Sequence, residues 1–252
     1  MNLRPIYIPF GGIFPALVGF LGNKEDFRKH FPRINHTTLY GQAHEGTSAI
    51  DRRVGQLHLI MHRIRTNSGV NILPKESYQI DFLYLPIDFE AFFIWLRMIM
   101  DQVAFLTPLF YERQEIMPRE SFERQLNWYI KKGMNLDKKY CNYLGSNMSW
   151  FIEMRKIRND SLHRYYWAYV ELKSKDQITM KRMRGNKLEQ EIESLDKTIG
   201  QFYLNFLGFS KFYEQHFSKI LKSRDEKFRF GGQEVQMVEE YFVSIEYFTK
   251  KV

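Results

Sequence analysis

The stretch DFEAFFIWLRMIMDQVAFLTPLFYER, residues 88–113, decides the fold. It is apolar on nearly all sides, which is typical of a helix buried in the middle of a protein. Asp88 is the expected N-cap of this helix, and Pro108 is expected to kink it near its end. The sequence therefore predicts a central buried helix around which the other elements pack.

Apolar residues at helical spacing predict further helices on both sides of the central one. In the stretch SAIDRRVGQLHLIMHRIR, residues 48–65, Thr47 or Ser48 is the expected N-cap. After the central helix, Pro118 marks an expected helix start and Gly133 the end of that helix. The predicted helices are those at about 47–65, 88–113, 118–133, 147–163 and 188–221.

Other segments favour extended or irregular structure. Residues 165–185, YYWAYVELKSKDQITMKRMRG, contain two β-rich runs around KSKDQ, which predicts a hairpin before the last helix. Residues 77–86, SYQIDFLYLP, alternate weakly and predict a short strand or an extended connector. Residues 1–46 contain four prolines and a Gly-Gly pair, so irregular structure rather than a long helix is expected there.

These elements together predict a mainly α protein with a small β-hairpin before its last long helix. An N-terminal extension at residues 1–84, an irregular arm followed by one helix, is expected to precede a helical domain at residues 85–252. The chain has 252 residues, of which 44% are hydrophobic, so it is long enough to bury a core. A single cysteine, Cys141, excludes an internal disulfide and a cysteine-based zinc site.

The sequence favours a cytoplasmic protein. No stretch reaches the roughly 18 uninterrupted apolar residues that a membrane-spanning helix needs, so no membrane association is expected. The first residues, MNLRPIYIPFGG, lack the apolar centre and the small-residue cleavage site of a signal peptide. A chain with one cysteine also fits a reducing compartment.

Positive charge makes nucleic acid the first candidate partner. The chain carries 37 Lys and Arg against 29 Asp and Glu, a formal net charge of +8, and such a surface attracts polyanions. Aromatic residues make up 16% of the chain, which fits either base-stacking surfaces or a core of large side chains. The alternative is that the charge serves only solubility.

The segment RNDSLH, residues 158–163, is the strongest candidate for a functional site. Four residues separate Arg158 from His163, and Asn159 follows the arginine directly. Chance alone gives roughly one or two Arg and His pairs with this kind of spacing in such a chain, and Arg53 with His58 is a second one. The asparagine, the place late in a helix after a kinked apolar helix, and the long helix that follows a hairpin favour the first pair.

This motif resembles the Arg-(four to six residues)-His motif of the HEPN superfamily of helical ribonucleases. The resemblance covers roughly residues 85–222 and implies a HEPN-like helical bundle. It also implies a homodimer in which two motifs face each other across one cleft, with RNA as the substrate and with neither a metal nor a cofactor. A toxin or defence effector, neutralised by a cognate antitoxin protein, is the expected biological setting.

The residue types in the motif suit the cleavage of RNA. A histidine with a pKa near about 6.5 can take a proton from a ribose 2′-hydroxyl or give one to the leaving 5′-oxygen. An arginine can hold the negatively charged phosphorane. Arg158, Asn159 and His163 are therefore the expected catalytic residues.

Helix geometry, at about 100° per residue, assigns these side chains to faces. Relative to Trp150, Arg158 falls at about 80°, inside the apolar sector, whereas Asn159 and His163 share the opposite face. Asn159 is expected to orient His163. Arg155 lies between the two groups, from where its guanidinium can turn towards the histidine.

A cation inside an apolar sector needs an anionic partner. Asp101, an acidic residue in the core of the central helix, is the expected partner of Arg158. The alternative is that Arg97 and Asp101, four residues apart, pair with each other. Arg155, Asp101 and Arg97 are thus the expected supporting residues.

The basic run KRMRGNK, residues 181–187, predicts an RNA-binding surface. The residues expected to contact phosphates are Lys181, Arg182, Arg184 and Lys187. The alternative is a solvated hairpin edge that its charges protect from pairing.

Two histidines on one predicted helix do not make a metal site. His58 and His62 lie four residues apart, but HLIMH lacks the glutamate of the zinc-protease motif. No metal ligands are therefore expected.

Two rival functions stay open from the sequence. The first is a non-catalytic HEPN-like helical module that dimerises or binds nucleic acid or nucleotide. The second is a structural or interaction protein whose N-terminal segment forms the partner-binding surface.

Overall fold

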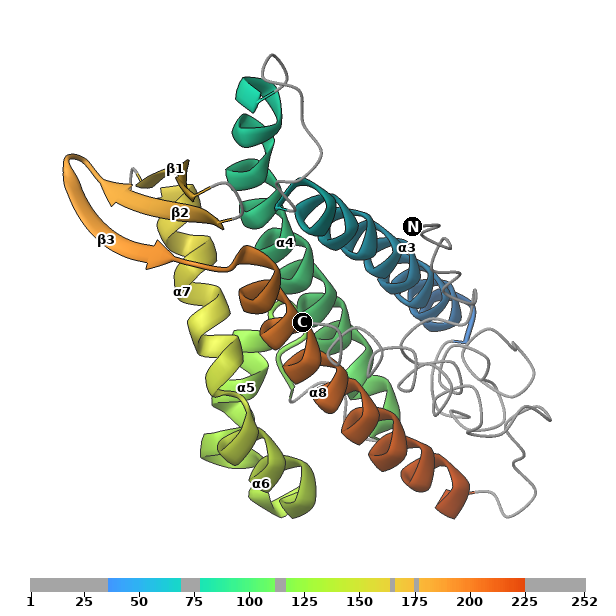
Figure 1. Cartoon of the computed structure of the whole chain (residues 1–252). Coiled ribbons are helices and arrows are strands. Elements are labelled where there is room, and N and C mark those ends of the chain that lie inside the picture. The colour runs from blue at the N-terminus through green and yellow to red at the C-terminus, as the bar shows by residue number, and fades with distance from the viewer. Residues whose placement is uncertain (1–35, 69–77, 112–116, 164–165, 175–176, 225–252) are drawn as a thin grey trace.

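The computed structural model describes residues 36–68, 78–111, 117–163, 166–174 and 177–224. Most of these residues are helical, and a small antiparallel sheet precedes the last helix (Figure 1), so the prediction of a mainly α protein is confirmed. The helices are α3 (His36–Ser68), α4 (Tyr78–Leu106), α5 (Phe122–Lys132), α6 (Lys138–Asn147), α7 (Ser149–His163) and α8 (Leu195–Arg224), with short 3-10 helices η2 (Thr107–Phe110) and η4 (Gly133–Asn135).

Helix α4 lies at the centre of the molecule, as its apolar sequence predicts. It contacts α3, α5, α7 and α8, and Figure 1 shows α3 on one side of it and α7 on the other. Phe93 of α4 is fully buried and meets the ring of Phe202 on α8 edge-on, with 5.0 Å between centroids. Although α4 is so apolar, neither it nor any other helix in the described ranges is long and apolar enough to cross a membrane.

The start of α4 differs from the prediction. The helix begins at Tyr78, so residues 78–86 are helical rather than a strand or a connector, and Pro86 lies inside the helix. Leu85 and Pro86 are buried, and their packing outweighs the hydrogen bond that an internal proline removes. Figure 1 shows the N-terminal part of α4 at an angle to the rest of the helix, which is the effect expected of a proline.

Asp88 consequently lies inside α4 and is not its N-cap. Its buried carboxylate accepts a hydrogen bond from Nε of Arg63 on α3 at 3.0 Å and a second one from Nη2 of the same guanidinium. A two-pronged contact of this kind satisfies a buried carboxylate, so the pair ties α3 to α4.

The end of α4 also differs from the prediction, because the helix stops at Leu106. Pro108 lies in η2, the 3-10 turn that follows, and therefore does not kink the helix. The hydroxyl of Thr107 donates to Val103 O at 2.7 Å and lies 2.9 Å from the hydroxyl of Tyr213. This end of α4 is thereby joined to α8.

Helix α3 is longer than predicted. It starts at His36, so residues 36–46 are helical, and Thr47 and Ser48 lie inside the helix rather than capping it. The four prolines that favour irregular structure all precede residue 36, and residues 1–35 lie outside the described part of the chain. The apolar stripe predicted for this helix is buried: Ile50, Val54, Leu57, Ile60 and Ile64.

Helix α5 ends at Gly133 as predicted, but it begins at Phe122 rather than at Pro118. Helix α6 follows, which was not among the predicted helices. The side chain of Asp137 caps α6 by accepting the N–H of Tyr140 at 2.8 Å.

Asp137 also joins the start of α6 to α8. Its Oδ2 contacts Nε2 of His216 and accepts the hydroxyl of Tyr111 at 2.9 Å. Burial alone would raise the pKa of Asp137, but the hydrogen bonds from His216, the Tyr140 N–H and Tyr111 lower that pKa overall. The carboxylate is thus held in its charged form.

Strands β1 (Tyr166–Ser174) and β2 (Gln177–Arg184) form the predicted hairpin, and β3 (Lys187–Ile192) adds a third antiparallel strand in the order β1-β2-β3. Helix α8 therefore starts at Leu195, and the prediction of helix from about residue 188 is wrong for β3. Arg184 pairs with Lys187 across a two-residue turn in which Gly185 has a φ of 58°. Hairpin turns of this length favour glycine in such a left-handed conformation. The preference of this turn for a hairpin outweighs the helix propensity of the residues that follow it.

The expected domain boundary between residues 84 and 85 falls within α4. Buried residues of α3 and α4 belong to the same core as those of α5 to α8. The division into an extension and a domain stays a prediction.

Folding stability is expected to fall as the pH drops from 7 to 4, because His58 of α3 is buried against α8. Its Nε2 contacts the hydroxyl of Tyr203, and burial lowers the pKa of His58 to about 4. Between these pH values an unfolded histidine, with a pKa of about 6.5, binds a proton that the folded one does not. This difference lowers the free energy of unfolding by about 3 kcal/mol. Chemical unfolding at several pH values should show a shallower pH dependence for His58→Gln than for the wild type.

The matched control is His62→Gln, at an exposed position on the same helix. Its pH dependence should equal that of the wild type. An unchanged slope in His58→Gln would contradict a neutral, buried His58.

Candidate functional site

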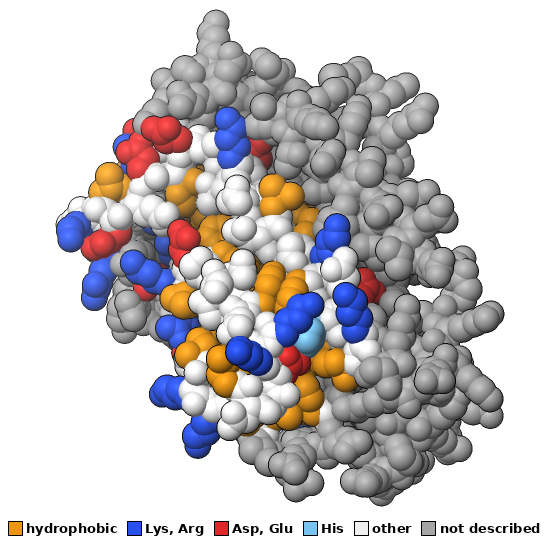
Figure 2. All heavy atoms as spheres, turned by 90° about the horizontal axis from the view of Figure 1, so that it is seen from below, with side chains coloured by type: hydrophobic (Ala, Val, Ile, Leu, Met, Phe, Trp, Pro, Cys, Tyr) orange, Lys and Arg blue, Asp and Glu red, His pale blue; other side chains and the backbone are white. Residues whose placement is uncertain are grey.

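Positive charge is not gathered into one broad patch on the described part of the face that Figure 2 shows. Lys and Arg side chains lie there in small groups, with hydrophobic side chains between them. The local arrangement of arginines therefore says more about a site than the net charge of +8 does.

An ion pair on α4 organises the candidate site. Nε of Arg97 donates to Oδ2 of Asp101 at 3.1 Å, one turn further along the helix. The other oxygen of Asp101 accepts the backbone N–H of Phe122 at 2.8 Å, at the start of α5. The first N–H groups of a helix have no partner within it, so Asp101 supplies one from α4 and fixes where α5 begins.

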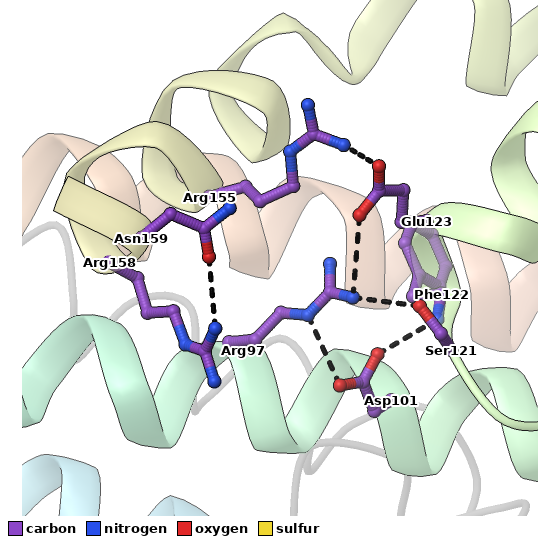
Figure 3. A network of polar contacts seen from close by, with 8 residues as sticks. All are labelled: Arg97, Asp101, Ser121, Phe122, Glu123, Arg155, Arg158 and Asn159. Atoms are coloured by element: carbon purple, nitrogen blue, oxygen red, sulfur yellow. Dashed lines mark hydrogen bonds and ion pairs between the residues drawn. The ribbon is translucent and has the colours of Figure 1, made fainter. Parts of the chain in front are cut away.

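Arg97 reaches from α4 to both neighbouring helices (Figure 3). Its Nη2 donates to Oγ of Ser121 at 2.8 Å, and its guanidinium carbon lies 4.9 Å from the centre of the Phe151 ring on α7. A cation over an aromatic face is attracted to it. The side chain is 12% exposed, so Arg97 is a nearly buried positive charge held between α4, α5 and α7.

Helix α7 contributes two more arginines. Arg155 forms an ion pair with Oε1 of Glu123 in the first turn of α5, and Oε2 of Glu123 lies 4.0 Å from Nη2 of Arg97. Arg158 donates from Nη1 to Oδ1 of Asn159 at 2.9 Å. Figure 3 shows the Arg97 side chain between Arg158 and Glu123. We refer to Arg97, Arg155 and Arg158 as the arginine cluster.

The arginine cluster has more donors than the acceptors around it can use. Nη1 of Arg97 and Nε of Arg158 are buried and have no hydrogen-bond acceptor among the described residues. Burial lowers the pKa of Arg97, Asp101 opposes this effect, and the charges of Arg158 and Arg155 lower the pKa further. Buried donors normally have acceptors, so this arrangement favours the binding of an anion.

The expected ion pair between Arg158 and Asp101 is wrong. Both oxygens of Asp101 are used, one by Arg97 and one by the N–H of Phe122, which confirms the alternative pairing. The reason is that side chains four residues apart on one helix are neighbours whatever packs against it. Arg158, by contrast, lies on α7 and could reach Asp101 only across the interface between α7 and α4.

The motif on α7 is placed only in part. The helix ends at His163, as predicted, but the side chain of His163 lies outside the described residues. Oδ1 of Asn159 is used by Arg158. That Asn159 orients His163, and that the three residues form one catalytic site, stay predictions.

Arg182 does not belong to the predicted RNA-binding surface, because its side chain is buried. It is 3% exposed and donates to Ile157 O at 3.1 Å, to Oγ of Ser161 at 3.2 Å and to Oε1 of Gln190 at 3.0 Å. Successive residues of a strand face opposite sides of the sheet, and the side of β2 that carries Arg182 packs against the end of α7. Arg182 therefore holds the sheet to the helix that carries the motif.

The other three residues of the basic run are more accessible. Arg184 is exposed, Lys181 pairs with Glu171 on β1 at 2.5 Å, and Lys187 pairs with Glu189 at 3.4 Å. Ion pairs at a surface are weak and are screened by salt, so they leave the lysines free to exchange partners. Their contact with RNA stays a prediction.

Two residues of the site escape sequence analysis. Ser121 and Glu123 flank Phe122, and both reach Arg97. A serine before a helix commonly caps it, but the Ser121 hydroxyl accepts from Arg97 and makes no cap hydrogen bond. Helical spacing shows which residues share a face of α5, but not that this face turns towards α7.

The second Arg and His pair in the sequence, Arg53 and His58, lies on α3. His58 is partly buried there and contacts the hydroxyl of Tyr203 on α8, which suits a packing residue rather than a proton-transfer group. His62 is exposed. Within the described ranges, no three His, Cys, Asp or Glu side chains are placed to hold a metal ion.

Comparison with known proteins identifies no relative of this chain. No protein-family model, no curated protein and no solved structure matches the chain. The resemblance to the HEPN superfamily therefore rests on residues 158–163 and on the order of the elements.

Arg182→Met is expected to lower the free energy of unfolding by about 2–4 kcal/mol. Methionine keeps an unbranched buried side chain but loses the hydrogen bonds to Ile157, Ser161 and Gln190. Urea unfolding measures the change. Arg184→Met, on the same strand but exposed, is the control and should stay within about 0.5 kcal/mol of the wild type; equal effects would contradict the structural role of Arg182.

Proposed function

We propose that the protein is a metal-independent endoribonuclease that acts as a homodimer through Arg158, Asn159 and His163. The observation that supports this best is the pair of buried guanidinium donors, on Arg97 and Arg158, that have no acceptor among the described residues. A phosphodiester offers both oxygen acceptors and a negative charge. Arg158 and His163 are five residues apart, about 7.5 Å along a helix axis and on different faces of the helix. The Arg158 guanidinium already donates to Asn159, which shares a face with His163, so we expect the long arginine side chain to reach the phosphate that His163 acts on.

The reaction that these residue types suit is a transesterification within the RNA. The ribose 2′-oxygen forms a bond to phosphorus, and the bond from phosphorus to the 5′-oxygen breaks. A neutral histidine takes the 2′-hydroxyl proton, and a protonated histidine gives a proton to the leaving 5′-oxygen. Arg158 stabilises the charge on the phosphorane. The products carry a 2′,3′-cyclic phosphate and a 5′-hydroxyl.

A dimer supplies the second histidine that this reaction uses. Base and acid are in opposite protonation states in one turnover, and each chain has one His163. Two α7 helices that meet at their C-terminal turns across a two-fold axis would bring two His163 residues and two arginine clusters into one cleft. A toxin or defence effector that an antitoxin protein neutralises is the biological setting that we propose.

A second candidate function is a non-catalytic module that binds nucleic acid or a nucleotide. It is favoured by the fact that the arginine cluster is complete without His163: Asp101, Ser121, Glu123 and Asn159 hold its guanidinium groups. A phosphate group can bind there whether or not a histidine takes part.

Wild-type protein is expected to cut labelled single-stranded RNA in the presence of EDTA and to leave 2′,3′-cyclic phosphate ends. His163→Ala should cut about 10²-fold more slowly, because a group that transfers protons in the reaction is lost. The control is His62→Ala, at an exposed position on α3, which should cut like the wild type. Intact RNA with the wild type, or equal rates with His163→Ala, would leave only the binding module.

Arg158→Ala is expected to weaken RNA binding without lowering the melting temperature. Asp101 keeps Arg97 as its partner, and one of three mutually repelling charges is removed. Fluorescence anisotropy with 2′-O-methylated RNA, which cannot be cut, measures the binding. The control is Arg124→Ala on α5, which loses the same charge at a site that is 70% exposed; early melting of Arg158→Ala with unchanged binding would make Arg158 a structural residue.

A further inference from the structure

Glu123 occupies the accessible side of the arginine cluster. One of its oxygens contacts Arg155, and the other lies 4.0 Å from Nη2 of Arg97. Glu123 is 37% exposed and Arg155 is 34% exposed, against 12% for Arg97. The Glu123 and Arg155 pair is therefore the more exposed part of the cluster, and the donors of Arg97 and Arg158 without acceptors among the described residues are buried.

The two carboxylates at the cluster differ in what else they do. Asp101 accepts the backbone N–H of Phe122 as well as the guanidinium of Arg97, so α5 loses a helix cap if Asp101 moves. The contacts described for Glu123 are made to arginine side chains alone. Its carboxylate can turn into solvent without breaking a backbone hydrogen bond.

Moving Glu123 away from Arg155 requires little free energy. Both side chains are about one-third exposed, and ion pairs in contact with solvent contribute little to stability. A phosphate that takes the place of the carboxylate keeps Arg155 paired and can also offer an oxygen to Nη1 of Arg97, a buried donor without an acceptor among the described residues. The exchange therefore increases the number of satisfied donors.

We propose that the arginine cluster is a phosphate-binding site in which the Glu123 carboxylate is an internal competitor that the ligand displaces. The ligand class is a phosphodiester or phosphate group, taken as a phosphate of RNA, and in that respect the inference rests on the proposed function. Glu123 sets the affinity of the site: anions too weak to replace a tethered carboxylate do not bind, whereas a polyanion held by several contacts does.

Affinity for a 2′-O-methylated oligoribonucleotide, measured by fluorescence anisotropy, tests this inference. Glu123→Gln removes the competing charge, so it should bind about tenfold more tightly than the wild type. The control is Glu120→Gln, which makes the same change in net charge three residues earlier in the chain. Glu120 is 76% exposed and pairs with Arg124 rather than with the arginine cluster. It should change the affinity less than twofold.

A second variant separates competition from net charge. Glu123→Asp keeps the charge of the wild type but withdraws the carboxylate from Arg155 and Arg97, so its affinity should lie between those of the wild type and Glu123→Gln. Weaker binding in Glu123→Gln would mean that the carboxylate positions Arg155 for the ligand, and equal gains in Glu123→Gln and Glu120→Gln would mean that only net charge matters. Either result overturns the inference, as does the absence of binding in all variants.

The cleavage assay keeps this test apart from the proposed function. If the wild type cuts no RNA but Glu123→Gln binds the oligonucleotide more tightly than Glu120→Gln does, the competitor inference stands and the ribonuclease proposal fails. If the wild type cuts RNA and the two glutamine variants bind alike, the ribonuclease proposal stands and the competitor inference fails.

Discussion

Arg97 and Asp101 are one turn apart on α4, and the hydrogen bond between them orients both side chains for their other contacts. Asp101, held by Arg97, accepts the first N–H of α5. Arg97, held by Asp101, donates to Ser121 and lies over the ring of Phe151. The pair thus determines where α5 begins and how close α7 comes, and the position of Glu123 follows from both. The same ion pair therefore determines both the packing of three helices and the geometry of the candidate site.

Charge at the site is not balanced in the way that a purely structural network would be. Arg97 and Arg155 contact the carboxylates of Asp101 and Glu123, whereas Arg158 donates to the neutral side chain of Asn159. Two buried donors, on Arg97 and Arg158, have no acceptor in the described part of the chain. Removing charges from water is unfavourable unless they are paired and hydrogen-bonded. The proposed phosphate site rests on this surplus of positive charge.

The elements were predicted from the sequence where one local property dominates. The apolar run of residues 88–106 identifies the central helix, and the β-rich runs identify β1 and β2. Local properties failed where tertiary contacts decide: packing keeps α4 helical through Pro86, and the turn at Gly185 makes a strand of residues 187–192, which have helix-forming side chains.

The candidate site was predictable only as a set of residue types. Arg158, Asn159 and Arg155 come from one helix, and their spacing identified them. The pair of Arg97 and Asp101 follows from their spacing on one helix. Which acid meets Arg155 depends on how α5 and α7 pack, and periodicity within one helix contains no information on that. Glu123 was missed for this reason. Arg182 was misplaced for a related one, because neighbouring residues of a strand are equivalent until the face that packs against α7 is known.

Helix α7 is held at two places, and this limits how the site can respond to a ligand. Near its start, Phe151 packs against Phe122 of α5 with 4.9 Å between ring centroids and lies under Arg97. Near its end, Arg182 of β2 donates to Ile157 O and Ser161. Arg155, Arg158 and Asn159 lie on the stretch from the first support to the second. A shift of α7 would break buried contacts at one end or the other. In the proposed phosphate site, the adjustable part is therefore the partly exposed Glu123 and Arg155 pair, and the fixed part is Arg97 and the helix that presents Arg158.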